Sequence, residues 1–580
     1  MDKPWFCAWM RCFCIVLIMV LSFLQLGRQA MAQNKGKGKK KFTTVPQIVP
    51  SAGPQLRGPS NPTGTGRPPR VGPNIQDNAL QEAFPDGLLG RSETSIVTSE
   101  DGSQMLVGFN DAQGFCGPPF GAPCTPENPP GLSGYAFSTD GGLTFMDGGA
   151  PPPFNNVFSR GDPWMDRGGF DNATFFYSSI AIDATTGANL GIGVYRGQFA
   201  GKSFAFSDVH TFNSSNPNDL YDKDAFGAAH DGSGAAYATI TNFIELCGQP
   251  AFGFGRIEVW RTHDSGNTWQ GPTTAGADQT FITDPTNPLC GLTGTLQQAS
   301  MPASGPNGEV YVAWSFGPTF NANSISTANA IKVAASFDGG ATFHTPVTAA
   351  SINSNFFNVP VGDNRSSLLD EPWIAVDTAS RHKGRIYVTF SSASTSVSPQ
   401  GSIACPNGFP PNTTCVPQSL VSSQIYITQS DDHGATWSTP VALASPPAGT
   451  TKRWWPVVKV EPGGNVDVIY LQSLETATTS TSTCIVPLDD GAVRVGPANS
   501  LVDTYWVQST NFGASFSAPT KVSSATSNWC TAVADSFPNF GDYISAFATG
   551  NHVYAAWGDG RNGIPDTFDA VILGAGKSSH

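Results

Sequence analysis

Ser336-Phe-Asp-Gly-Gly-Ala-Thr-Phe343 is the stretch of this 580-residue chain that decides its fold. It follows a pattern in which a small polar residue, Asp, Gly, Ser or Thr and an aromatic residue stand at fixed offsets. The pattern recurs at 138–145, 262–269, 430–437 and 509–516, where the last copy has Asn511 in place of Asp. A degenerate sixth copy at 197–204 keeps only the Gly and the Ser-Phe ending. Five copies in register predict a repeat protein.

Each residue of the motif has a local physical role. A carboxylate in a tight hairpin accepts hydrogen bonds from turn N–H groups, and Gly supplies a left-handed backbone. The aromatic residue can pack between neighbouring sheets. The motif therefore predicts a recurring hairpin rather than a reactive site.

Short β-branched and aromatic runs precede each copy of the motif. Before the fourth copy they are Pro372-Trp-Ile-Ala-Val376, Arg385-Ile-Tyr-Val-Thr-Phe390 and Gln424-Ile-Tyr-Ile-Thr-Gln429. Such runs, bounded by Gly and Pro turns, indicate strands. We predict an all-β chain forming a β-propeller of four-stranded antiparallel blades, with seven blades favoured and six as the alternative. The expected inner strands start near Thr94, Pro163, Ala225, Ala299, Pro372, Trp455 and Tyr543.

The last module has no copy of the motif after it. Its outer strand must come from elsewhere, and the natural donor is the segment ahead of Thr94, since this closes the ring without leaving a free edge. Composition agrees with an all-β chain. Gly (63) and Pro (46) are frequent, charged residues make up only 13%, and no long stretch shows a helical apolar period.

The N-terminus has the pattern of an export signal. Lys3 and Arg11 precede an apolar run at 12–26, and Ala30-Met-Ala32 offers small residues for cleavage. The alternative is an uncleaved anchor, but the run is short for a membrane span. We expect a signal peptide at 1–32, a disordered Lys-rich and then Pro/Gly-rich tail at 33–80, and the propeller at 81–580. The protein is then secreted, periplasmic or held at the cell surface, with no stable membrane span after cleavage.

Charge divides unevenly between the tail and the rest. Residues 1–80 hold 11 basic and 2 acidic residues, a net of +9, which leaves 31 − 11 = 20 basic and 44 − 2 = 42 acidic residues, a net of −22. A domain this acidic is a poor nucleic-acid binder. We expect a monomer without a nucleic-acid partner.

Eight cysteines follow the predicted signal, an even number in an exported chain. All lie in predicted loops of types that emerge on one face of a propeller, here called the upper face. Pairing neighbours predicts four disulfides, Cys116–Cys124, Cys247–Cys290, Cys405–Cys415 and Cys484–Cys530. No cysteine spacing resembles a zinc site.

Charged and aromatic residues recur where the inner strands begin, beside the channel mouth of the upper face. We predict that Asp162, Asp224, Asp370, Glu371 and Asp542 converge there, with Arg453, Trp454 and Tyr543 beside them. Clustered carboxylates with aromatic residues suit sugar recognition, acid–base catalysis or a hard cation such as calcium. No other cofactor is expected, and metal ligands are not assigned. The alternative is purely architectural, with these carboxylates satisfying backbone N–H groups at strand starts.

The repeated motif resembles the Asp box of the sialidase and BNR-repeat superfamily. The chain also resembles secreted bacterial BNR-repeat proteins without an assigned reaction. These proteins share sequence segments such as Asp370-Glu-Pro-Trp-Ile-Ala-Val-Asp377 and Gly541-Asp-Tyr-Ile544. That resemblance is closer than the one to true sialidases, whose Arg-Ile-Pro signature is absent from Gly90-Arg-Ser-Glu-Thr-Ser-Ile96. The resemblance to sialidases implies an arginine clamp, for which Arg91, Arg365 and Arg453 are the candidates. It also implies a Tyr nucleophile at Tyr543 and carboxylates for acid–base work.

Three functions remain open at this level. The first is recognition of a glycan or another extracellular ligand at the upper face, with Asp224, Arg453, Trp454 and Asp542 as binding residues. The second is an exo-acting glycosidase, an exo-α-sialidase first and a glycan lyase second, with Asp162, Asp370, Glu371 and Tyr543 as catalytic residues. The third is a non-catalytic scaffold. The propeller alone does not choose among them.

Overall fold

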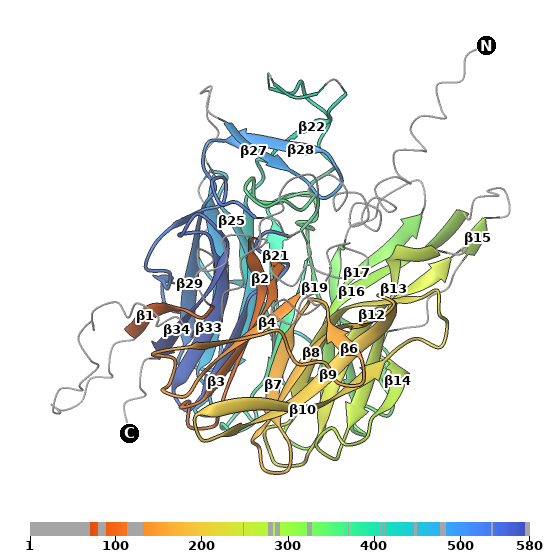
Figure 1. The fold of residues 1–580 in the computed structure, drawn as a ribbon, viewed down its shortest axis with the longest axis vertical. Coiled ribbons are helices and arrows are strands. Elements are labelled where there is room, and N and C mark those ends of the chain that lie inside the picture. The colour runs from red at the N-terminus through yellow and green to blue at the C-terminus, as the bar shows by residue number, and fades with distance from the viewer. Residues whose placement is uncertain are drawn as a thin grey trace, which may run out of the picture.

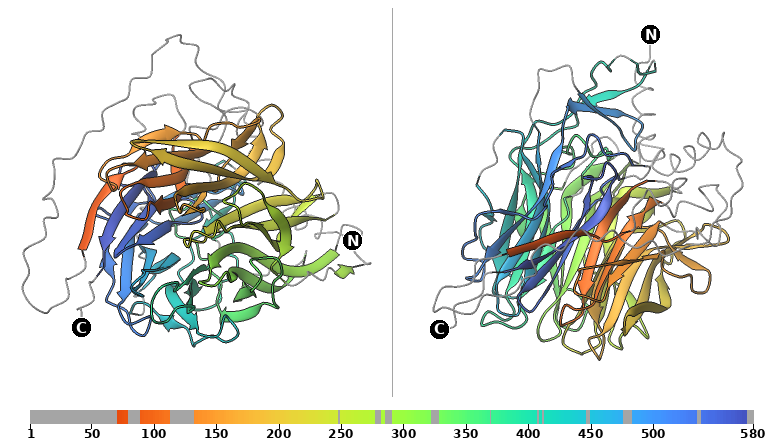
Figure 2. Two further views of the ribbon diagram at one scale, coloured as in Figure 1. Left: turned by 90° about the horizontal axis from the view of Figure 1, so that it is seen from below. Right: turned by 60° about the vertical axis from the view of Figure 1, so that its left-hand side comes forward.

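The described part of the chain is a seven-bladed β-propeller. The computed structural model describes residues 70–78, 89–112, 132–246, 249–276, 282–284, 291–321, 328–368, 370–406, 408–410, 412–445, 449–475, 483–534 and 538–574. Seven sheets of four or five antiparallel strands surround a central axis (Figures 1 and 2). Each inner strand contacts the inner strands of both neighbouring blades, so the ring is complete. Among these residues there is no α-helix, and hence none that could cross a membrane.

The blades follow one another in sequence order. Blade 1 contains β2 (Arg91–Thr98), β3 (Met105–Asp111), β4 (Ser133–Ser138) and β5 (Met146–Gly149). Blade 2 contains β6 (Val157–Ser159), β7 (Trp164–Gly168), β8 (Thr174–Asp183), β9 (Asn189–Ala200) and β10 (Ser203–Phe212). Blade 3 contains β11 (Leu220–Ala228), β12 (Ala236–Leu246), β13 (Gln249–Thr262) and β14 (Gln270–Thr274). Blade 4 contains β15 (Ile282–Asp284), β16 (Gly291–Ser304), β17 (Val310–Asn321), β18 (Ala330–Ser336) and β19 (Val347–Ser351).

The remaining three blades complete the ring. Blade 5 contains β20 (Trp373–Val376), β21 (Ile386–Ala393), β23 (Ser423–Ser430) and β24 (Val441–Ala442). Blade 6 contains β25 (Lys452–Val460), β26 (Val466–Leu474), β29 (Leu501–Ser509), β30 (Thr520–Lys521) and β31 (Ser527–Asn528). Blade 7 contains β32 (Ser545–Thr549), β33 (His552–Asp559), β34 (Asp566–Leu573) and the N-terminal strand β1 (Arg70–Gln76). The predicted blade number and the predicted inner strands are confirmed.

Ring closure occurs as expected, through an outer strand from ahead of Thr94. β1 pairs antiparallel with β34, and the register shifts between Val71 and Asn74. This shift accommodates Gly72 and Pro73, because a proline without an N–H group is tolerated at an edge strand or a bulge. Strand β1 lies before residue 81, so blade 7 includes residues that the sequence analysis placed in the tail.

In five blades the repeated motif forms the predicted hairpin between the third and fourth strands, counted from the inner strand. In blade 4, the Asp338 carboxylate accepts hydrogen bonds from Ser336 Oγ (2.8 Å), Thr342 N (2.9 Å) and Thr342 Oγ1 (2.6 Å). Gly340 adopts φ 82°, and its N–H donates to Ser336 Oγ at 2.8 Å. These hairpins lie on the face opposite the channel mouth described below. The degenerate copy at 197–204 occupies the same place in blade 2, between β9 and β10.

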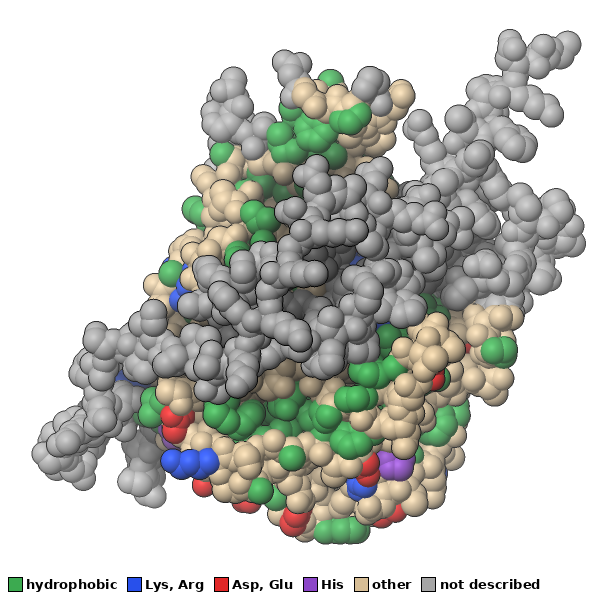
Figure 3. Space-filling model, viewed as in Figure 1, with side chains coloured by type: hydrophobic (Ala, Val, Ile, Leu, Met, Phe, Trp, Pro, Cys, Tyr) green, Lys and Arg blue, Asp and Glu red, His purple; other side chains and the backbone are tan. Residues whose placement is uncertain are grey.

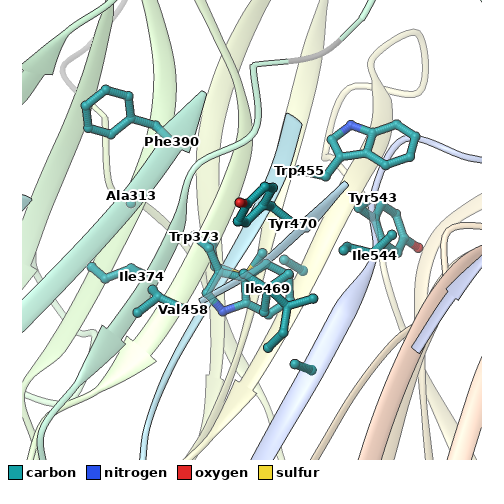
Figure 4. Packing of buried hydrophobic residues seen from close by; sticks show 14 of the residues in the cluster. Ala313, Trp373, Ile374, Phe390, Trp455, Val458, Ile469, Tyr470, Tyr543 and Ile544 are labelled. Atoms are coloured by element: carbon teal, nitrogen blue, oxygen red, sulfur yellow. The ribbon is translucent and has the colours of Figure 1, made fainter. Parts of the chain in front are cut away.

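The core lies between the blades, where the aliphatic and aromatic residues of facing sheets meet. Trp314, Trp506 and Trp557 are among the largest fully buried side chains. Near the axis, Trp373, Trp455, Tyr543 and Ile544 project from the inner region of three blades (Figure 4). Blade packing therefore fixes the inner strands on which the candidate site is built.

A small three-stranded sheet stands on the upper face beside the channel (Figure 1). This cap sheet consists of β22 (Cys415–Pro417), β28 (Val493–Pro497) and β27 (Thr483–Pro487), and β22 runs parallel to β28. Two of the predicted disulfides, Cys405–Cys415 and Cys484–Cys530, are confirmed at the cap sheet. The other two predicted pairs, Cys116–Cys124 and Cys247–Cys290, lie outside the described residues.

Candidate functional site

The inner strands enter the channel through a recurring irregularity. In β2, β11, β16 and β25 the register with the next strand shifts by a local irregularity. At these four shifts, a non-glycine residue adopts a left-handed backbone with φ between 48° and 58°, namely Glu93, Lys223, Ala299 and Trp455; Asp162, just ahead of β7, does the same with φ 55°. A bulge of this kind re-aims a side chain, and strained backbone of this kind clusters at functional sites. In three blades the re-aimed side chain is charged.

Lys223 lies at the centre of the channel mouth. Its ammonium group forms ion pairs with Asp162 of blade 2 (3.4 Å) and with Asp542 ahead of blade 7. Burial alone would lower the pKa of Lys223, but these two carboxylates and Asp222 hold it well above its usual value. One side chain from blade 3 therefore bridges carboxylates that the sequence places far apart.

Asp542 is the most strongly held carboxylate of the mouth. Arg365 donates from Nε to Asp542 Oδ1 at 3.1 Å and also binds through its terminal nitrogen. Burial would raise the pKa of Asp542, but Arg365 and Lys223 hold it at about 2. Asp542 is thus a fixed negative charge whose oxygens are already occupied.

Glu371 is in the opposite situation. It lines a small pocket at the mouth, but no described residue hydrogen-bonds its carboxyl group or forms an ion pair with it. Burial, and then the nearby Asp542 carboxylate, raise the pKa of Glu371 to about 8. At neutral pH this group is mostly a neutral acid that can donate a proton.

The same pocket is lined by Asp162, Trp164, Lys223, Asp224, Ala299, Ser300, Met301, Glu371 and Tyr543. Asp224 is 2% exposed; Ser178 donates to its Oδ2, while Oδ1 has no hydrogen-bond partner among the described residues. Burial raises the pKa of Asp224 well above its ordinary value. On the neighbouring wall, Trp164 stacks on Tyr543 with ring centroids 4.4 Å apart.

Glu93 completes the cluster from blade 1. Asn110 Nδ2 donates to Glu93 Oε2 at 2.8 Å, and Asn110 Oδ1 accepts from the Asp162 N–H at 2.9 Å. Burial, and then the charge of Asp162, raise the pKa of Glu93 well above its ordinary value. Asn110 therefore connects the Glu93 carboxyl group to the backbone that carries Asp162.

The structure brings five of the eight predicted site residues together, namely Asp162, Asp224, Glu371, Asp542 and Tyr543. The other three do not converge on the mouth. The Asp370 carboxylate is buried with Ser354 and the Asn355 N–H (2.8 Å), and burial raises its pKa to about 7. Arg453 donates to Gln472 and Gln424, and Trp454 packs beside Trp455 and Trp529 in the core.

The candidate arginine clamp does not form among the described residues. Arg91 is fully buried between Asp111 (3.4 Å) and Asp566 (3.7 Å), and Arg453 is occupied as described above. Only Arg365 reaches the mouth. The Tyr543 hydroxyl donates to the Pro163 carbonyl at 3.0 Å, and burial raises its pKa well above 10. A phenol held in this way is a weak nucleophile.

Glu93, Lys223 and Asn110 were not among the site residues predicted from the sequence. Lys223 lies between Asp222 and Asp224, and the only available signal was its position at the start of a predicted inner strand. Arg365, considered only for the clamp, is held by the cap sheet. Arg494 of β28 donates to the carbonyl oxygens of Asp363 (2.5 Å) and Arg365.

No family model and no curated protein matches this chain. Among solved structures, it is similar to an α-L-arabinanase of Penicillium chrysogenum complexed with arabinobiose, at 12% identity and a TM-score of 0.38, over 74% of this chain and 98% of the other. It is also similar to a mutant of Trypanosoma rangeli sialidase displaying trans-sialidase activity, at 11% identity and a TM-score of 0.36, over 69% of this chain and 55% of the other. A third similar structure is YCF48 bound to D1 peptide, at 9% identity and a TM-score of 0.35, over 89% of this chain and 99% of the other. These likenesses assign no activity, and the strand pairing itself defines the propeller.

Proposed function

We propose that the chain is an extracellular carbohydrate-recognition propeller whose ligand enters the pocket at the channel mouth. The observation that carries this proposal is Glu371, a pocket-lining acid that no described residue hydrogen-bonds. Asp162 and Asp224 line the same pocket, beside the buried rings of Trp164 and Tyr543. Carboxyl groups match the hydroxyl groups of a sugar.

Hydrolysis of a glycosidic bond is the second candidate. It needs one carboxyl group that is protonated at neutral pH and a second that is ionised. Glu371, with its pKa of about 8, suits the general acid. Asp162, beside the Lys223 ammonium, is the candidate for the second carboxylate. The engaged Tyr543 hydroxyl and the dispersed arginines give no support to sialidase chemistry in particular.

The compartment and the superfamily are part of the same proposal. The hydrophobic N-terminal run and the two disulfides support export. The hydrogen bonds of the five hairpins support membership of the sialidase and BNR-repeat superfamily. A non-catalytic scaffold needs only the fold and remains an outcome of the test below.

The test compares the wild-type protein with Glu371→Gln on a glycan array and on a panel of polysaccharides and sialosides. Glu100→Gln is the matched control, because it makes the same change in an exposed turn. We expect Glu371→Gln to weaken array binding about tenfold or more and to abolish any turnover, whereas Glu100→Gln leaves both unchanged. Any turnover should also fall as pH rises through about 8, since Glu371 then loses its proton. A wild-type protein that neither binds the array nor turns over any substrate contradicts the proposal.

A further inference from the structure

The channel mouth carries an excess of acidic groups. Six carboxyl groups gather around it, contributed by Glu93, Asp162, Asp222, Asp224, Glu371 and Asp542. Against them, the described residues that interact with the cluster offer two cations, Lys223 and Arg365. Both cations are already paired with carboxylates, so the mouth has no uncompensated positive charge to attract an anion.

Neither cation is free to receive an anionic ligand. Lys223 is engaged by Asp162 and Asp542. Arg365 is engaged by Asp542 and lies 3.7 Å from Asp489. A carboxylate arriving with a ligand would have to displace one of these buried ion pairs, which leaves an unpaired buried charge behind.

Hydrogen-bond acceptors, in contrast, are left without partners inside the pocket. Asp224 Oδ1 is buried and unpaired, in a residue only 2% exposed. Glu371 lines the same pocket without a hydrogen bond from any described residue. A buried acceptor without a donor is costly, so Asp224 Oδ1 is prepared for a ligand that brings a donor, and the partly exposed Glu371 carboxyl group lies beside it in the same pocket.

We propose that the ligand group entering this pocket carries a protonated primary amine, as an amino sugar does, and that carboxylate-bearing sugars are excluded. An ammonium group offers three donors and a positive charge, which matches the unpaired acceptors of Asp224 and Glu371. The sugar part of this inference rests on the proposed function, whereas the amine part rests on the charges and vacant acceptors alone. A divalent cation fits less well, because Lys223 already places a positive charge at the centre. No group of three or more His, Cys, Asp or Glu side chains within the described ranges is arranged to hold a metal.

Binding of an amine has a signature that a neutral sugar lacks. The Glu371 carboxyl group is held protonated by its surroundings, and a nearby ammonium group favours its ionised form. Complex formation at pH 7 should therefore release protons. Calorimetry in two buffers of different ionisation enthalpy measures that release directly.

The experiment titrates the full chain with three oligosaccharides and a simple diamine. The probes are a glucosamine oligomer, its fully N-acetylated counterpart, a galacturonate oligomer and putrescine. We expect the glucosamine oligomer to bind about tenfold or more tightly than the acetylated oligomer, with proton release, and the galacturonate oligomer not to bind. Glu371→Gln should remove most of that preference and the proton release, while Glu100→Gln keeps both.

The outcomes separate this inference from the proposed function. Equal binding of the acetylated and free-amine oligomers overturns the amine inference but keeps carbohydrate recognition. Binding of putrescine alone, lost in Glu371→Gln, keeps the amine inference and overturns the carbohydrate proposal. Binding of the galacturonate oligomer overturns the charge argument, and silence with all four probes overturns both proposals.

Discussion

Lys223 shows how a single residue organises the site. Its left-handed backbone, with φ 49°, is unfavourable for a residue with a Cβ by about 1–2 kcal/mol. The ion pairs with Asp162 and Asp542 offset that cost, because without the ammonium group these carboxylates would repel each other in a buried setting. Lys223 therefore serves as the built-in counter-ion of the channel mouth.

Replacing Lys223 with Met should lower the free energy of unfolding by about 3–5 kcal/mol, the usual effect of removing one partner from a buried ion pair. Lys223→Gly removes the same charge but relieves the backbone strain, so it should be about 1 kcal/mol less destabilising than Lys223→Met. Urea denaturation at pH 7 measures both changes. If Lys223→Met is as stable as the wild type, the ammonium group is not the counter-ion of this cluster.

Asn511 shows how the hairpin motif tolerates a change of chemistry. Asn511 Oδ1 still accepts from Ser509 Oγ (2.8 Å) and from the Ser515 N–H (2.9 Å). Its Nδ2 then donates to Ser515 Oγ at 2.8 Å, where the Asp boxes have a Thr hydroxyl donating to the carboxylate. Because a hydroxyl can reverse its role, Asn completes the same ring of hydrogen bonds without a charge.

At the scale of elements, the cap sheet connects a disulfide to the site. Cys484 lies in β27, next to β28, whose Arg494 holds the loop that carries Arg365. Removing the Cys484–Cys530 bond, which spans 46 residues, should cost about 4 kcal/mol by loop entropy, against about 2.7 kcal/mol for Cys405–Cys415, which spans 10. Paired Cys→Ser variants in urea denaturation test this order. The opposite order contradicts a loop-entropy origin of the difference.

Blades and hairpins were predictable from sequence because their signals are local. Strand runs and the Asp-box motif depend on a few neighbouring residues, and ring geometry then places the starts of the inner strands together. Side-chain direction at those starts was not predictable. The register shift between Trp454 and Val457 brings Trp455 to the left-handed position, which turns Arg453 and Trp454 away from the mouth. Asp370 and Glu371 are adjacent, and only Glu371 faces the pocket.

Loop contacts left even less trace in the sequence. Arg365 reaches the mouth from a segment before β20, and Arg494 of the cap sheet fixes that segment. No strand period defines either position. The closing strand was predicted ahead of Thr94, but the residues of β1 were not located, since Gly72 and Pro73 interrupt the strand pattern and resemble a turn.

At the scale of the whole molecule, charge burial predicts an acid optimum of stability. Burial raises the pKa of Asp363 and Asp370 to about 7 and of Glu371 and Asp569 to about 8. These groups bind more protons in the folded state, so their stabilisation is complete below about pH 4 and is lost as pH rises through 7 to 8. Asp338, Asp432 and Asp542 have pKa values of about 2, so their stabilisation is present above about pH 4 and is lost towards pH 2. Unfolding in urea should therefore show greatest stability near pH 4–5. A maximum at pH 8 contradicts this balance.

Closure of the ring depends on one strand, because β1 supplies the outer strand of blade 7. On the face shown in Figure 3, the charged side chains that are visible lie mostly near the lower edge, and hydrophobic side chains are visible above them. Stability must then come mainly from blade-to-blade packing, which requires every blade to be complete. In blade 7, β1 supplies the outer strand, and the Asp77 N–H and Asn78 side chain extend its contacts to Thr567 and Asp566.

A chain that begins at residue 79 should therefore be less stable than one that begins at Arg70. Deleting β1 exposes the backbone of β34 as an unpaired edge and removes Val71 and Ile75, which uncovers the core residues that these two side chains pack against. We expect a lower melting temperature and concentration-dependent association through the free edge, since unpaired strands recruit other chains. Melting and light scattering of the two chains at several concentrations measure both effects. Because the two chains differ only in nine residues that include β1, equal melting temperatures and equal scattering would show that the ring does not depend on this closure.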